Sequence, residues 1–366
     1  MKKLAFNEIG SNFFEEKSSD RIIQNKLPQK DITYLDSGRS AIRLVLDSIN
    51  LKRKIALLPA YTCNTVIEPF VKRKYQVCYY DVDTNFLIDK EEFKSRVEYL
   101  KPSVILLHSY FGKDTIKNIR EYLLELRKKD IYIIEDITQL LLQDNKDINT
   151  AHFLVGSIRK WCTIPDGGFI KNNTNIRLNL NEYQENRGLL EKQTEAFKRK
   201  KEYTKTMKKE TKESYLALYK QSKEILDSND KKIFIMSQVS KELLTKYDFK
   251  YIKEQRENNY RYLYDNLKKV NGVQNTLGKL EKGETPLYFP ILIDATKRKE
   301  FQEYMAKENI YCPIIWSRDK KNLNIQGYNC EDIYEKIICI PCDQRYDEKD
   351  MERVVRIVRN FTKKDK

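Results

Sequence analysis

Two side chains in this sequence have the types and the spacing for covalent chemistry on a planar ligand. Asp136 follows the apolar run at residues 131–134, and Lys160 lies shortly before the glycine pair Gly167-Gly168. A carboxylate at the end of a buried strand can keep a pyridine nitrogen protonated, and a lysine amine can form a Schiff base with an aldehyde. Pyridoxal 5′-phosphate (PLP) presents both groups, so the pair predicts a site for this cofactor.

The neighbours of both residues favour the same interpretation. Ile158 and Trp161 flank Lys160, and a lysine in such an apolar, partly dry setting loses its proton more easily. Gln139 lies on the same face as Asp136 if a helix or turn begins there, so both can approach one edge of a ring. The alternatives are a surface lysine and an aspartate that only caps a helix.

A phosphate group has two candidate partners in the sequence. Gly38 and Arg39 precede a helical run at residues 41–49, and the first turn of a helix offers free backbone N–H groups to an anion. Ser157, three residues before Lys160, adds a hydroxyl group. The alternatives are an ordinary helix cap and a turn serine.

Two further side chains follow buried strands of the same expected sheet. His108 comes directly after the run 104–107, and Cys63 comes shortly after the run 55–58. Parallel strands bind ligands at their carboxyl ends, so His108 and Cys63 are candidate cofactor-binding residues. The alternatives are a structural histidine and a cysteine that only packs near the site.

The spacing of apolar runs predicts an α/β fold with a mainly parallel sheet. Four runs lack polar alternation and are separated by helical patterns, which is typical of strands buried on both faces. The later part of the chain predicts a compact α+β unit. We therefore expect a large domain at residues 1–245 and a small C-terminal domain at residues 246–366. The runs are 55–58, 77–80, 104–107 and 131–134, and the helical patterns are 66–72 and 116–128.

Two long segments have sequences that predict helical structure. Residues 180–232 are rich in Lys and Glu and carry few large apolar side chains, which predicts a long exposed helix in an insertion or lid. Residues 237–270 carry an apolar stripe and are expected to form a helical segment that joins the two domains.

Composition limits the classes of function. The 366 residues carry a net charge of +15, but basic and acidic residues are interleaved, which favours a solvated surface over a nucleic-acid partner. No apolar run reaches the length of a membrane span, and the first eight residues lack the apolar stretch of a signal peptide. Seven cysteines with two histidines argue against a metal site, and the Cys339–Cys342 pair is expected to pack as reduced thiols in a cytoplasmic protein.

Six segments, taken in chain order, carry a likeness to a known family. They are residues 37–42, 58–63 leading to 80–83, 108–112, 135–139, 157–168 and 340–346. With them the chain resembles the DegT–DnrJ–StrS family of PLP-dependent sugar aminotransferases, which have the fold-type I architecture. The resemblance spans residues 35 to about 360 and leaves out much of the 180–232 segment.

The resemblance implies a role for each candidate residue. Lys160 would form the internal aldimine and move the proton between the substrate carbon and the cofactor, and Asp136 would pair with the pyridinium nitrogen. Gln139 would contact the 3′-oxygen side of the ring. The phosphate would be held by Gly38, Ser157 and the backbone of Arg39.

The resemblance also implies the substrates and the assembly. Members are homodimers with sites at the subunit interface, and they typically pass an amino group from glutamate to a keto-sugar nucleotide in polysaccharide or amino-sugar biosynthesis. This chain departs from the family at Cys63, where an aromatic ring often covers the cofactor. It also departs in the short spacing from Ser157 to Lys160 and at residues 234–237, where the partner-contacting sequence is usually Asn-Tyr-Arg.

Two other functions remain open at this stage. One is a different PLP reaction on a sugar, such as dehydration, for which some relatives replace the lysine with histidine; this chain keeps Lys160. The other is a regulatory protein on the same scaffold, against which the joint presence of Lys160, Asp136 and Gln139 argues.

Overall fold

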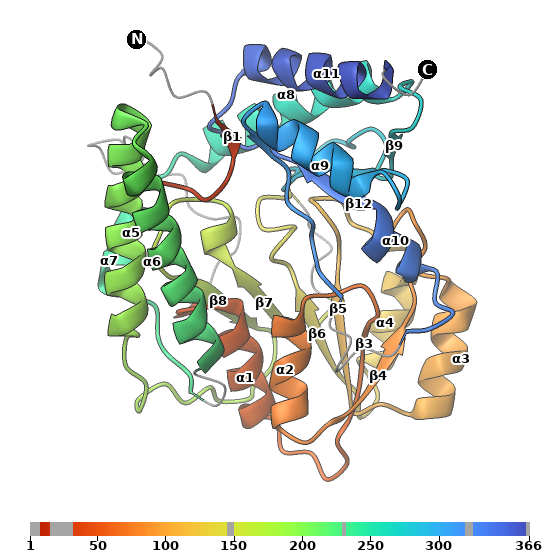
Figure 1. Ribbon diagram of the computed structural model, residues 1–366. Helices are drawn as coiled ribbons and strands as arrows, with labels where there is room; N and C mark the ends of the chain where they lie inside the picture. Colours follow the sequence, from red (N-terminus) through yellow and green to blue (C-terminus); the bar gives the residue numbers. More distant parts are fainter. Residues whose placement is uncertain (1–7, 15–31, 145–149, 229–231, 319–324, 364–366) are drawn as a thin grey trace.

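The computed structural model describes residues 8–14, 32–144, 150–228, 232–318 and 325–363. Two of the expectations lie partly outside these ranges, namely the one drawn from the first eight residues and the end of the insertion at residues 229–231. Within these ranges the chain forms a large sheet with helices against it and a second group of helices and short strands above it (Figure 1).

Seven strands form the large sheet, and most neighbouring pairs are parallel. Five neighbouring strands, β4, β3, β5, β6 and β7, run parallel to one another, whereas β8 is antiparallel to both β7 and β2. This arrangement confirms the predicted fold class. Strand β5 is buried along its whole length, which explains why its sequence is apolar without alternation. In sheet order the strands are β2 (Ile32–Leu35), β8 (Gly168–Asn172), β7 (Phe153–Ser157), β6 (Tyr132–Asp136), β5 (Val104–His108), β3 (Ile55–Pro59) and β4 (Gln76–Tyr80).

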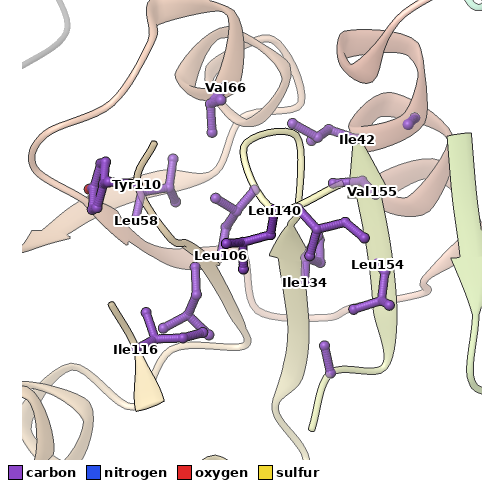
Figure 2. Packing of buried hydrophobic residues seen from close by; sticks show 14 of the residues in the cluster. Ile42, Leu58, Val66, Leu106, Tyr110, Ile116, Ile134, Leu140, Leu154 and Val155 are labelled. Carbon is purple, nitrogen blue, oxygen red and sulfur yellow. The ribbon is translucent and has the colours of Figure 1, made fainter. Parts of the chain in front are cut away.

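Helices packed against this sheet begin at capping side chains. Ser37 accepts a hydrogen bond from the N–H of Ser40 at the start of α1, and Asp89 caps α3 in the same way. Figure 2 shows part of the core, to which α1 contributes Ile42 and three strands contribute Leu58, Leu106 and Ile134. These helices are α1 (Gly38–Ser48), α2 (Asn64–Lys72), α3 (Lys90–Leu100) and α4 (Arg120–Leu126), with the 3-10 turn η1 (Lys117–Ile119) before α4.

A second hydrophobic core lies in the C-terminal part of the chain. Strand β10 pairs antiparallel with β9 and β12, and the helices α8, α9 and α11 pack with this small sheet. Ile9, near the start of the chain, belongs to this core because β1 pairs with β11. The expected domain boundary at residues 245 and 246 stays a prediction. The elements are β1 (Ile9–Gly10), α8 (Phe249–Leu267), β9 (Gln274–Asn275), β10 (Phe289–Leu292), α9 (Arg298–Lys307), β11 (Ile310–Tyr311), α10 (Cys330–Lys336), β12 (Ile337–Ile340) and α11 (Glu348–Lys363).

Both segments are mostly helical as predicted, but each is interrupted, and the insertion is not one long helix. The insertion forms two helices, α5 (Arg187–Thr206) and α6 (Lys209–Ser228), because Met207 adopts a left-handed conformation with φ of 53° and ends α5. The later segment forms α7 (Gln238–Leu244) and α8, and the side chain of Asp248 caps the start of α8. None of the described helices is both long and apolar enough to cross a membrane.

We expect the substitution Gly168→Ala to destabilise the fold, because the new Cβ would lie 2.1 Å from the carbonyl carbon of Ser37 and 2.6 Å from the nitrogen of Gly38. These backbone atoms cannot yield without moving α1, and overpacking of this kind costs about 1–3 kcal/mol. The control is Gly188→Ala in α5, where the nearest atom lies 3.8 Å away and alanine should stabilise the helix by up to about 1 kcal/mol. Urea unfolding measures both effects, and equal midpoints would contradict the prediction.

Candidate active site

The ends of three neighbouring strands bring predicted site residues to one edge of the sheet. β5 ends at His108 and β6 ends at Asp136, and these two residues are paired in register. β7 ends at Ser157, and the 3-10 turn η2 (Ile158–Lys160) then carries Lys160. The structure therefore gathers residues that are far apart in the sequence, at the edge where parallel sheets bind ligands.

Lys160 lies at the wall of a cavity of about 880 Å³. The residue is exposed to the solvent of this cavity, while protein atoms lie densely around its amine. Burial first, and then the positive charge of Arg159, lower the pKa of Lys160 to about 8, while the charges of Cys63 and Asp136 oppose the shift. The amine is therefore neutral in a larger fraction of molecules than an ordinary lysine, as a nucleophile requires.

Asp136 is a buried carboxyl group held by the turn that follows it. Burial raises the pKa of Asp136, whereas hydrogen bonds from Thr138 and the charge of Lys160 lower it. The backbone N–H of Thr138 donates to Oδ1 of Asp136 over 2.8 Å. An oriented, buried carboxylate of this kind can pair with a protonated ring nitrogen.

Gln139 and His108 are buried, and the protein holds both of them. Oε1 of Gln139 accepts a hydrogen bond from the N–H of Phe111. Nε2 of His108 lies 3.2 Å from the carbonyl oxygen of Tyr61, and its ring stacks on Trp316 with centroids 5.4 Å apart. Burial lowers the pKa of His108 to about 4, so the ring is neutral at physiological pH. Of the predicted site residues only Lys160 is among those that line the cavity, and the roles of Gln139 and His108 as cofactor contacts stay predictions.

Cys63 lies directly before α2 and is half-buried. Its sulfur accepts a hydrogen bond from the hydroxyl of Thr65 over 3.1 Å. Cys63 is among the groups that oppose the lowering of the Lys160 pKa, so its short side chain lies on the same side of the site as the amine. Its role as a cofactor contact stays a prediction.

The start of α1 lies beside the end of β7. A Cβ added at Gly38 would lie 3.4 Å from backbone atoms of Gly156 and 3.7 Å from Cβ of Ser157. The backbone at the start of α1 therefore lies close to Ser157. We call this place the cradle, since backbone N–H groups at a helix start and a serine hydroxyl are donors that suit a phosphate.

The side chain of Arg39 points away from this cradle to α6. Its Nη1 donates to the carbonyl oxygen of Leu226 over 2.6 Å, and its Nη2 pairs with Asp227 at 2.8 Å. The guanidinium is committed to these contacts, which leaves the backbone of Arg39 as the group that can face a phosphate.

Arg159 is a candidate residue that sequence reasoning missed. Burial lowers the pKa of its guanidinium, the nearby charge of Asp36 opposes this, and its Nε is buried without a hydrogen-bond partner among the described residues. An unpaired buried donor costs about 1–3 kcal/mol, which an anionic ligand can offset. The lysine amine, the buried carboxylate, the cradle and this unpaired donor together fit PLP.

Comparisons with known proteins find similarity to one family of aminotransferases. Residues 237–359 match the model of the DegT/DnrJ/EryC1/StrS aminotransferase family. PseC of Helicobacter pylori, an aminotransferase involved in pseudoaminic acid biosynthesis, has 13% identity and a TM-score of 0.67, with 99% of this chain and 100% of that chain covered. Ntda of Bacillus subtilis, solved with bound cofactor PMP, has 15% identity and a TM-score of 0.63, with 92% and 74% covered. These two structures show the fold.

One curated relative is a different kind of protein. The chain is 29% identical over 119 residues to malonyl-[acyl-carrier protein] O-methyltransferase 2 of Ilyobacter polytropus. The aligned part covers 31% of this chain and 41% of that protein. The chain thus spans less than half the length of this relative. The family match and the fold together confirm the resemblance to the DegT/DnrJ/EryC1/StrS aminotransferases, a family of PLP-dependent enzymes.

We expect two substitutions to move the pKa of Lys160 in opposite directions. Arg159→Gln should raise it above about 8 because a neighbouring positive charge is lost, and Asp136→Asn should lower it because a neighbouring negative charge is lost. The pH dependence of reductive methylation of Lys160 in the cofactor-free protein, followed by mass spectrometry, measures both shifts. The exposed Lys209 on α6 serves as the reference for reagent reactivity. Shifts in the same direction in both variants would contradict the electrostatic account.

Proposed function

We propose that this protein is a PLP-dependent aminotransferase that moves an amino group from an amino acid, glutamate, to a keto-sugar linked to a nucleotide. The observation that carries the proposal is Lys160, whose pKa is lowered to about 8 at the wall of a large cavity and within electrostatic reach of Asp136. The family match supports the same chemistry. The proposal extends to a cytoplasmic homodimer that serves polysaccharide or amino-sugar biosynthesis.

Each site residue has a defined task in this reaction. When bound, PLP supplies the electron sink that stabilises negative charge on the substrate carbon. Lys160 holds the cofactor through its amine and carries the proton to and from that carbon. Asp136 keeps the ring nitrogen protonated, and its buried position strengthens this pairing. The phosphate is held by Gly38, Ser157 and the backbone of Arg39.

A buried arginine in the same cavity supports an amino donor with a carboxylate. Arg256 of α8 is 1% exposed, and its guanidinium donates to Oε1 of Gln344 over 2.8 Å and to two backbone carbonyls. It forms no ion pair with a carboxylate in the described part of the chain. The acidic group that acts most strongly on its pKa, Asp343, is paired with Arg345 at 2.7 Å. A buried cation without its own counter-ion favours an anionic ligand.

Replacing Arg256 should therefore weaken the binding of the amino donor more than it slows the chemical step. In Arg256→Lys the charge remains but the planar pair of donors is lost, so KM for glutamate should rise about tenfold or more at nearly unchanged kcat. Arg256→Gln should raise KM further. Steady-state kinetics with glutamate and with alanine as donors measure the effect, and thermal melting checks that each variant is folded. An unchanged KM for glutamate in folded Arg256→Gln would contradict this role.

The size of the cavity supports a large acceptor. Sites for small molecules and cofactors usually enclose about 300–1,000 Å³, and this cavity lies near the upper end of that range. A nucleotide-linked sugar needs this space, since it must reach Lys160 with its sugar while its nucleotide lies further out.

The substitution Lys160→Ala tests the proposed function directly. Treating the wild-type protein with PLP and borohydride should attach the cofactor covalently at Lys160, as peptide mass spectrometry can show. Lys160→Ala should lose this labelling and at least about a thousandfold of transaminase turnover, because both the covalent link and the proton carrier are removed. Lys209→Ala, at an exposed site on α6, is the matched control. Full turnover in Lys160→Ala would overturn the proposal.

A further inference from the structure

The hairpin of α5 and α6 forms one wall of the cavity that contains Lys160. The two helices stand side by side at one edge of the molecule, with α1 next to them (Figure 1). The sequence left the role of this insertion open. The structure assigns to the cavity wall the side chains Gln193 and Phe197 of α5 and Tyr219, Lys220, Lys223 and Leu226 of α6.

These side chains combine two kinds of chemistry on one surface. Tyr219, Lys223 and Leu226 are separated by four and three residues, so they share one face of α6. The rings of Phe197 and Tyr219 pair with centroids 6.2 Å apart. The wall therefore places an aromatic pair next to two lysine ammonium groups, Lys220 and Lys223.

The two lysines have little competition from carboxylates. Lys220 reaches Glu224 only at 4.0 Å, and both side chains are largely exposed, so this pair is weak. Lys223 forms no ion pair with any described residue. Among the described lining residues one is acidic, Asp343, and it is already paired with Arg345. The cations of the lining also include Arg159, Lys160 and Arg256.

The hairpin is fixed to the rest of the protein, so its wall has a defined position. Lys200 of α5 is fully buried and donates to the hydroxyl of Ser11 over 3.2 Å. Glu8 accepts from the Tyr203 hydroxyl over 2.8 Å and pairs with Lys212 at 2.7 Å. Both helices therefore hold the segment at residues 8–14 against the C-terminal core, and these contacts fix the position of the wall.

We propose that this wall binds the nucleoside diphosphate part of the acceptor, with the phosphates at Lys220 and Lys223 and the base against Phe197 and Tyr219. Lysine ammonium groups bind phosphate oxygens through charge-assisted hydrogen bonds, and aromatic rings stack on bases of any identity. The inference rests on the proposed function, since it names the element that recognises the proposed substrate.

Titration calorimetry of the full-length, PLP-loaded protein with uridine 5′-diphosphate, thymidine 5′-diphosphate and pyrophosphate tests the wall. At least one nucleoside diphosphate should bind to the wild type. The double variant K220Q/K223Q should bind it about tenfold or more weakly, because two charge-assisted contacts are lost. Phe197→Leu should lower the affinity for the nucleotide but leave the affinity for pyrophosphate unchanged, since only stacking is lost. The control is Lys209→Gln, which removes a lysine of α6 that does not line the cavity.

The outcomes separate this inference from the proposed function. The conversion of PLP by glutamate, followed by absorbance, needs no acceptor and should be unchanged in K220Q/K223Q. Suppose that the wild type carries out this conversion but binds neither diphosphate at millimolar concentration; the wall then has no such role. The same conclusion follows if both diphosphates bind to the double variant as tightly as to the wild type. A wild type that binds the diphosphate through the wall but shows no conversion by glutamate would refute the transaminase instead.

Discussion

The buried side chain of Trp161 fixes the position of the residue that precedes it, Lys160. Its indole N–H donates to the carbonyl oxygen of Thr138 over 2.6 Å. Thr138 in turn donates its N–H to Asp136 and accepts from the N–H of Ser157 through its hydroxyl, over 3.0 Å. One residue thus links the carboxylate, the cradle serine and the lysine turn. Because a buried indole without a partner costs about 1–3 kcal/mol, the three groups keep their relative positions or move together.

The same tryptophan connects the large sheet with the C-terminal core. Its carbonyl oxygen accepts from Nε2 of Gln344 over 2.9 Å, and the guanidinium of Arg256 lies 4.7 Å from its ring centroid. The cavity therefore forms where both parts of the chain meet, and cations from both parts face it. Without an anion these charges repel one another, which contributes to the low pKa of Lys160 through Arg159. An anionic ligand reduces this repulsion and should stabilise the folded state by mass action.

The sequence predicted the parts of the site that depend on local pattern. Strands buried on both faces leave uninterrupted apolar runs, so Asp136 and His108 could be placed at strand ends. Ser157 and Lys160 follow Asp136 in the chain at a short spacing from each other, so they could be assigned to the same site. The break at Met207 could not be predicted, because a left-handed methionine between two charged helices leaves no glycine or proline signal. Arg256 and the lining residues of the hairpin escaped detection for another reason. A helix face that lines a wet cavity has the same composition as one that faces bulk solvent, so only tertiary contacts distinguish them.

Arg39 joins the phosphate cradle to the hairpin wall. Its backbone lies in the first turn of α1, while its guanidinium bonds the carbonyl of Leu226 and the carboxylate of Asp227 at the end of α6. Leu226 itself lines the cavity, so one arginine touches both parts of the site. A guanidinium donates in fixed directions, so a displacement of α6 must either move the start of α1 or break these bonds. The proposed ligand binding at the wall and the proposed phosphate binding at the cradle should therefore be coupled, and linkage requires the coupling to act equally in both directions. This contact ties the charged insertion to the start of α1, as its proposed role in the site requires.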